Sequence, residues 1–262
     1  MKGKAMRLID LNADVGESFG NWRMGNDEGV LGIVSSANVA CGFHAGDPVV
    51  MAKTCEIAKR NGVSVGAHPG FADLQGFGRR PMPMSALELE TMVAYQIGAF
   101  MGIAARAGMA VAHVKAHGAL YNLAEADAEV AGAIARAVKA VDGSLIMVGG
   151  TGSPMVGAAE VAGVRFAAEG FPDRAYADDG KLLSRKLPGA VLHDPAEAAA
   201  QAVRMAIDGR ILTVGGKLLP CRVETLCIHG DEPTAVAVAG AIKAALAAAG
   251  ATIATLPEVM RG

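Results

Sequence analysis

Acidic and amide side chains follow directly on a short apolar run near the start of the chain. The segment reads Asp10-Leu11-Asn12-Ala13-Asp14-Val15-Gly16-Glu17. Alternate residues of a strand share a face, so Asp10, Asn12 and Asp14 point together, and Glu17 follows just beyond them. Carboxylates gathered in this way can act as a general base, bind a cation or orient a histidine. A tight turn also uses Asn, Asp and Gly, but it does not need acids inside a strand-like run, so we predict a functional site here.

Five of the six histidines lie at or near the ends of apolar runs, and only His193 falls outside this pattern: the five are His44, His68, His113, His117 and His229. Neutral imidazole suits both proton transfer and metal ligation. An Asp with two or three histidines from separate strands would form a divalent-metal site. Spacing alone does not establish the metal, and one or two of these histidines can be structural, so both points are left open. The predicted catalytic residues from these segments are His44, His68, His117 and Asp231.

Lys115 ends an apolar strand-like run and precedes His117 by two positions, on the same face. A lysine in this place is poorly placed for solvent and needs an anion. The anion is either an internal carboxylate, from Glu169 or Asp14, or the carboxylate or phosphate of a substrate. We predict that Lys115 and Glu169 belong to the site.

Loops supply further groups that can bind anions. Arg79 and Arg174 lie on loops from which a guanidinium can clamp a carboxylate. The segment Gly149-Gly150-Thr151-Gly152-Ser153 opens a helix whose free N–H groups favour phosphate, although a plain turn explains it equally well, and it is not a Walker A loop. The predicted substrate- and phosphate-binding residues are Asn12, Asn38, Arg79, Gly150, Arg174 and Tyr176.

The composition excludes several classes of partner. The chain has 262 residues, a net charge of −2, 52% hydrophobic residues and only 4% aromatic residues. This gives no electrostatic or stacking basis for nucleic acid and no attraction to an anionic membrane. Four cysteines without a C-x-x-C pair favour reduced thiols, and no apolar run reaches membrane-spanning length. We expect a cytoplasmic protein whose residues 1–6 form a disordered start.

Strand-like and helix-like runs alternate along the whole chain. Strands are expected at 8–11, 35–40, 63–66, 111–115, 145–148, 165–168 and 226–229, and helices at 49–61, 85–107, 127–141, 153–162, 195–208 and 234–249. Seven such steps predict one α/β domain over residues 1–262, a distorted seven-stranded parallel (β/α) barrel. A Rossmann fold would need a G-x-G-x-x-G segment, which is missing. The long irregular region 170–194 is expected to be a functional loop.

These segments together resemble the LamB/YcsF family, which is identified as the A component of bacterial 5-oxoprolinase. The likeness runs from about Arg7 to Ala254; besides the opening motif it rests on Ser36 to Asp47, Gly66 to Pro69, His113 to Asn122, Glu169 to Tyr176, and Cys227 to Asp231. One departure is Ala116, where the resemblance leads us to expect proline. The resemblance implies a barrel similar to that of the glycoside hydrolases and polysaccharide deacetylases. It also implies ATP-dependent opening of 5-oxo-L-proline to L-glutamate with partner subunits B and C, and Mg²⁺ with the ATP.

The roles that follow are hypotheses. Lys115 with Arg79 or Arg174 would bind the anionic groups, His44 or His68 with Asp14 would activate water, and His117 would serve the leaving nitrogen. Two other functions stay open: a metal-dependent deacetylase or amidase that works without ATP, and a non-catalytic component that only binds substrate. The sequence does not decide whether the chain forms a homo-oligomer.

Overall fold

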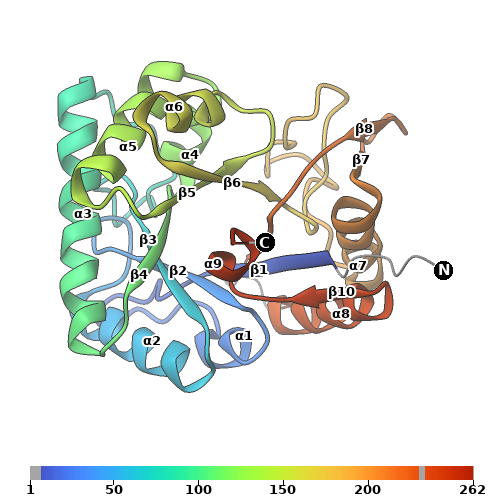
Figure 1. Cartoon of the computed structure of the whole chain (residues 1–262), viewed down its shortest axis with the longest axis horizontal. Coiled ribbons are helices and arrows are strands. Elements are labelled where there is room, and N and C mark those ends of the chain that lie inside the picture. Colours follow the sequence, from blue (N-terminus) through green and yellow to red (C-terminus); the bar gives the residue numbers. More distant parts are fainter. Residues whose placement is uncertain (1–6, 230–233, 262) are drawn as a thin grey trace.

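The computed structural model describes residues 7–229 and 234–261, and its centre is a closed barrel of parallel strands. The predicted seven-stranded (β/α) barrel is confirmed, with helices around the outside (Figure 1). The strands follow one another around the barrel, and the last pairs with the first: β1 (Arg7–Val15), β2 (Ser36–Ala40), β3 (Ser64–His68), β4 (Val111–Lys115), β5 (Ile146–Gly150), β6 (Arg165–Gly170) and β9 (Thr225–His229). The expectations for residues 1–6 and for Asp231 fall outside the described residues.

The six predicted helices are present, and several short elements were missed. The predicted set corresponds to α2 (Pro48–Arg60), α3 (Ala86–Arg106), α5 (Ala128–Val141), α6 (Pro154–Ala162), α7 (Pro195–Val203) and α8 (Ala235–Ala248). The helix expected to run to residue 208 changes after α7 into a π-helix, η1 (Arg204–Asp208). Elements of three to seven residues carry too few apolar repeats to show a period; those missed are α1 (Asp27–Leu31), α4 (Gly118–Ala124), α9 (Leu256–Val259), the antiparallel pair β7 (Arg210–Leu212) and β8 (Leu218–Pro220), and β10 (Ala251–Ile253).

Strand β1 is longer than predicted, because the polar residues on its inward face made the apolar run in the sequence look short. Leu11 and Ala13 are fully buried in the hydrophobic core between the barrel and the helices. The alternate residues Asn12 and Asp14 point into the barrel, where they meet side chains of strands that do not neighbour β1. The polar positions interrupt the apolar run, so the prediction ended at residue 11, whereas the strand continues to Val15. This extension carries Asp14 to the carboxyl end of the barrel.

The long segment 171–194 is irregular, as expected. It contains only isolated bridges: Arg174 pairs with Val191, and Tyr176 pairs with Leu182 and with Thr213 outside the segment. None of the four cysteines, all of which are described, forms a disulfide. Within residues 7–229 and 234–261, no helix combines the length and the apolar character that a bilayer crossing demands.

Replacement of Gly66 by alanine should destabilise the barrel strongly. A Cβ atom at this position of β3 would overlap the buried ring of His113 on the neighbouring strand β4. Overpacking of this kind costs about 1–3 kcal/mol or more. Urea unfolding followed by circular dichroism measures the loss. The matched control is Gly98→Ala in α3, where a Cβ meets open space and should add about 0.5–1 kcal/mol. An unchanged unfolding free energy for Gly66→Ala would contradict the packing described.

Candidate active site

The carboxyl ends of the strands open into a pocket of about 530 Å³. Active sites of (β/α) barrels lie at this end. Asp14 from β1, His68 from β3 and Lys115 from β4 line the pocket, together with His117 at the start of α4. The region 181–186 of the irregular loop forms another wall of the pocket, and a function for this loop stays a prediction. The structure therefore brings these four predicted site residues together, while their roles stay predictions.

Lys115 is held inside the barrel by two carboxylates. Its Nζ lies 3.0 Å from Asp14 Oδ1 and 3.0 Å from Glu169 Oε1, and it also donates to the sulfur of Cys227 at 2.9 Å. Burial works against the charged amine, but the attraction of Asp14 and Glu169 outweighs it and raises the pKa of Lys115 well above its usual value. The internal-carboxylate alternative is thus the observed arrangement. Because Lys115 also lines the pocket, its charge can still act on a bound ligand.

Asn12 and Asn38 lie beneath the pocket rather than in its wall. Asn12 donates to Glu169 Oε1 at 3.0 Å, and Asn38 donates to Asn12 and to Asp14 at 2.7 and 2.8 Å. Both amides are almost fully buried and neither is among the pocket-lining residues. Direct substrate contact, as predicted, does not fit this position. The two amides instead hold the carboxylates of Asp14 and Glu169 in place.

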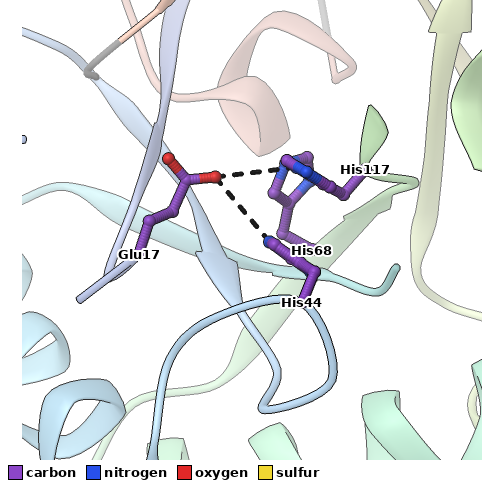
Figure 2. A group of neighbouring side chains, drawn as sticks. All are labelled: Glu17, His44, His68 and His117. Carbon is purple, nitrogen blue, oxygen red and sulfur yellow. Dashed lines mark hydrogen bonds and ion pairs between the residues drawn. The ribbon is translucent and has the colours of Figure 1, made fainter. Parts of the chain in front are cut away.

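Three imidazoles and one carboxylate form a compact group beside the pocket: Glu17, His44, His68 and His117 (Figure 2). One potential ligand atom of each lies within 4.8 Å of the others. They come from the ends of four consecutive strands, β1 to β4, and the segments that follow them. The rings of His44 and His117 stack at 3.7 Å between centroids, and Glu17 Oε1 lies 3.7 Å from His44 Nε2 and 3.6 Å from His117 Nδ1. This donor set could hold a metal ion.

The backbone fixes the tautomers of two of these rings. His68 Nδ1 lies 2.7 Å from the carbonyl oxygen of Lys115, and His117 Nε2 lies 2.8 Å from that of Phe77. A carbonyl only accepts, so each of these nitrogens carries the hydrogen and donates it. Phe77 adopts a φ of +54°, a left-handed conformation that is rare for a bulky residue and that accompanies the direction of its carbonyl toward His117. Outer partners of this kind orient metal-ligating histidines.

Burial keeps His44, His113 and His117 neutral. It lowers the pKa of His44 and His117 well below 6.5, with the neighbouring histidines adding to the effect. Burial, and then the charge of Lys115, lower the pKa of His113 to about 3. His113 donates its ring hydrogen to Asn38 at 2.8 Å and is a structural member of the interior. Burial also raises the pKa of Asp10 to about 6, although hydroxyl donors from Thr225, Ser36 and Ser35 oppose this shift.

The chain should lose stability as the pH falls below about 6.5. The pKa of His113 is about 3 in the folded chain, so only the unfolded chain binds this proton between about pH 6.5 and pH 3. The stabilising contribution of the neutral histidine is fully present above this window. Within the window, the free energy of unfolding falls by about 1.4 kcal/mol for each unit by which the pH decreases, for each such histidine. Asp10 acts in the opposite sense, since its stabilising effect is present at low pH and is lost as the pH rises through about 6. The effect of Asp10 offsets that of only one of the three histidines whose pKa is lowered, His44, His113 and His117.

Urea unfolding at about pH 7 and about pH 5 measures this loss. His113→Asn should flatten the profile by about one proton, and the exposed control His193→Gln should not change it. Stability that is constant or increases on acidification would contradict the buried neutral histidines.

The remaining predicted binding residues differ in their positions. Arg79 lines the pocket and lies over the ring of Phe77. Arg174 also lines it, but its buried guanidinium donates to the carbonyl oxygens of Ala190 and Leu183. Tyr176 lies outside the lining, and its hydroxyl accepts from the N–H of Phe171.

The Gly150 amide, offered as a phosphate cradle, already donates to the carboxylate of Glu125 at 2.9 Å. A phosphate at this amide would have to displace that carboxylate, so the plain turn describes the segment better. The predicted substrate contacts of Tyr176 and Gly150 are therefore not supported by their positions.

Several pocket residues were not predicted. Tyr121 from α4 places a buried hydroxyl there, and no hydrogen-bond partner for it occurs among the described residues. Glu125, Arg185 and Lys186 also line the pocket. Tyr121 lies one helical turn after His117, so a prediction of helix α4 would have placed both at one end of the barrel. Arg185 and Lys186 could not be predicted, because no sequence pattern shows how the irregular segment 171–194 folds over the pocket.

A closed parallel barrel with titratable side chains at the carboxyl ends of its strands is typical of enzymes. Residues 9–261 match the LamB/YcsF family, and the chain belongs to this family. A relative from Rhodopseudomonas palustris, named as the A component of 5-oxoprolinase, is 56% identical over 94% of this chain and 97% of its own. One of the same name from Methylococcus capsulatus is 53% identical over 98% of both chains.

Solved structures agree with this family and with the fold. The crystal structure of the lactam utilization protein from Thermus thermophilus is similar with a TM-score of 0.90 and 46% identity, over 94% of this chain and 99% of that one. The T48 deacetylase covers 98% of this chain and 92% of its own, with a TM-score of 0.54 and 14% identity. The second likeness concerns the fold alone.

Proposed function

We propose that this chain is the A component of an ATP-dependent 5-oxoprolinase, a hydrolase that opens the cyclic amide 5-oxo-L-proline to L-glutamate as ATP is cleaved to ADP and phosphate. The observation that carries the proposal is the nearly full-length similarity to relatives that bear this name. The name of the Thermus neighbour supports the same substrate class, because 5-oxoproline is a lactam. Partner subunits B and C, Mg²⁺ with the ATP and a cytoplasmic location belong to the proposal.

The charges around the pocket suit such a substrate. Six basic residues line it against two acidic ones, Asp14 and Glu125. The basic residues are Arg79, Lys115, Arg174, Lys181, Arg185 and Lys186. An excess of cations attracts the carboxylate of 5-oxoproline and would also stabilise a phosphoryl group on the lactam oxygen.

The chemistry explains why ATP is needed. An amide is a poor electrophile, and phosphoryl transfer from ATP to the lactam oxygen makes the ring carbon reactive. Water then adds to this carbon, the carbon–nitrogen bond breaks, and the nitrogen leaves with a proton as the free amine. The resulting acyl phosphate reacts with a second water to give glutamate and phosphate. The reaction needs a base for the water and cations for the developing negative charge.

Asp14 is the group best placed to direct the attacking water. Its Oδ2 lies 3.5 Å from His68 Nε2 and its Oδ1 lies 3.0 Å from Lys115 Nζ, so it connects the histidines with the buried cation. In this scheme Asp14 accepts a proton from the attacking water. Lys115 stabilises the negative charge that develops on the oxygen atoms bound to the attacked ring carbon. His117 is neutral, so it cannot supply a proton of its own to the leaving nitrogen, and the proton taken from water serves that purpose.

A second candidate function is a metal-dependent amidase or deacetylase that works without ATP. The group formed by Glu17 and the three histidines favours it, because these residues would hold an ion that would supply a Lewis acid for amide hydrolysis. The third alternative, a component that only binds substrate, predicts that a change of Asp14 or His44 impairs assembly of the complex without a separate defect in turnover.

One assay separates these functions. The chain is incubated with 5-oxo-L-proline, alone and with subunits B and C, and glutamate and phosphate are measured. The proposal expects both products in equal amounts, only with ATP and the partner subunits. Glutamate formation that survives removal of ATP but not treatment with a chelator would support the amidase instead. His193→Gln, an exposed change far from the chemistry in sequence, serves as the matched control.

A further inference from the structure

Two nitrogen lone pairs face each other beside the pocket. His68 Nε2 and His117 Nδ1 lie 3.0 Å apart. The opposite nitrogen of each ring donates its hydrogen to a backbone carbonyl, so neither of the two facing nitrogens carries one in the neutral ring. Two acceptors at this distance repel each other unless a cation lies between or beside them. The contact requires either a shared proton or a metal ion.

His44 supplies a second and independent indication. Its side chain is fully buried, and neither ring nitrogen has a hydrogen-bond partner among the described residues. A buried polar group without a partner costs about 1–3 kcal/mol. The ring stacks on His117, with Nε2 directed toward the same space as the facing nitrogens (Figure 2). A single ion in this space would satisfy His44 and the His68–His117 pair together.

The geometry points to a divalent transition-metal ion bound by Glu17, His44, His68 and His117. We infer this site from separations of 3.0, 3.6 and 3.7 Å between neighbouring ligand atoms. Four ligands about 2.0–2.1 Å from a tetrahedral zinc ion lie roughly 3.3–3.4 Å apart. Three imidazole nitrogens with one carboxylate select Zn²⁺ or a similar ion, whereas Mg²⁺ prefers oxygen ligands and water. The site is therefore distinct from the Mg²⁺ that accompanies ATP.

The surrounding charges favour a dication. Three carboxylates lie around this space, those of Asp14, Glu17 and Glu169. The ammonium group of Lys115 is paired with two of them, Asp14 and Glu169. His68 and His117 line the pocket, so the ion would lie at its wall, next to Asp14. A bound ion there supplies a Lewis acid for a water or a carbonyl oxygen. This use of the ion rests on the proposed function, but its binding does not.

Zinc binding to the chelator-treated full chain tests the site. Metal content after gel filtration gives the stoichiometry, and competition with a chromophoric chelator gives the affinity. We expect one Zn²⁺ per chain, a rise in melting temperature on its addition, and Co²⁺ spectra of nitrogen and oxygen ligation without thiolate. His44→Gln and Glu17→Gln should each weaken binding by at least about 10–100-fold, the loss caused even by removal of an outer-shell partner. His193→Gln should bind as the wild type does.

A folded wild-type chain that binds zinc no more tightly than His44→Gln would overturn the site and leave a shared proton between His68 and His117. If either variant fails to fold, the stoichiometry and the Co²⁺ spectrum of the wild type decide alone. These measurements use neither ATP nor 5-oxoproline. Failure of the metal site and failure of the proposed function are therefore separate results.

Discussion

Replacement of Lys115 by methionine should abolish glutamate formation by the complex reconstituted with subunits B and C. Methionine keeps most of the length of the side chain but removes the cation that lies between Asp14 and Glu169 at the pocket. Loss of one preorganised electrostatic partner costs about 10²–10³ in rate, and the loss here should be at least that large. The rate of glutamate release measures it. Unchanged turnover would remove Lys115 from the mechanism.

The same substitution should also weaken the fold. It leaves two buried carboxylates without their cation, and breaking such a buried pair costs about 3–5 kcal/mol. Activity must therefore be compared at a temperature where urea unfolding shows the variant to be folded. Lys53→Met, at an exposed position on α2, is the matched control and should leave both activity and stability near those of the wild type. A loss of activity in this control would indicate a general effect of lost positive charge.

Replacement of Asp14 by asparagine should lower the rate by about 10²–10⁴, the range for loss of a general base. Asparagine keeps the shape of the side chain, and Lys115 keeps Glu169 as its ionic partner, so the fold should tolerate the change better than Lys115→Met. Glutamate release should fall while the complex with B and C still assembles. Loss of assembly without a separate defect in turnover would instead favour the alternative in which the chain only binds and positions substrate.

The barrel could be predicted because its strands are covered by helices and its chemistry follows strand ends. Lys115 and His68 each end a strand, and both line the pocket at the carboxyl end of the barrel, where active sites of such barrels lie. The two alternative partners named for Lys115, Asp14 and Glu169, are both its partners in the structure.

The features that could not be predicted depend on how deep a side chain lies inside the barrel and on the direction of backbone carbonyls and loops. Asn12 and Asn38 lie on the correct face of their strands, but strand spacing does not say how far below the mouth a side chain lies, and both are interior braces. The tautomers of His68 and His117 depend on carbonyls of Lys115 and Phe77 that no local pattern reveals. The meeting of Glu17 with the histidines likewise needs the paths of the loops after the strands.

Glutamate release by the complex that carries Asp14→Asn and Lys115→Met together tests most directly whether this chain opens the lactam. The paired change removes one charge of each sign from the pocket. If the mouth of this barrel is the site, the wild-type complex releases glutamate and phosphate in equal amounts, and the doubly substituted chain, folded and assembled with B and C, releases no glutamate above background. Wild-type rates of glutamate release from that complex would contradict a site in this chain and place the ring opening in one of its partners.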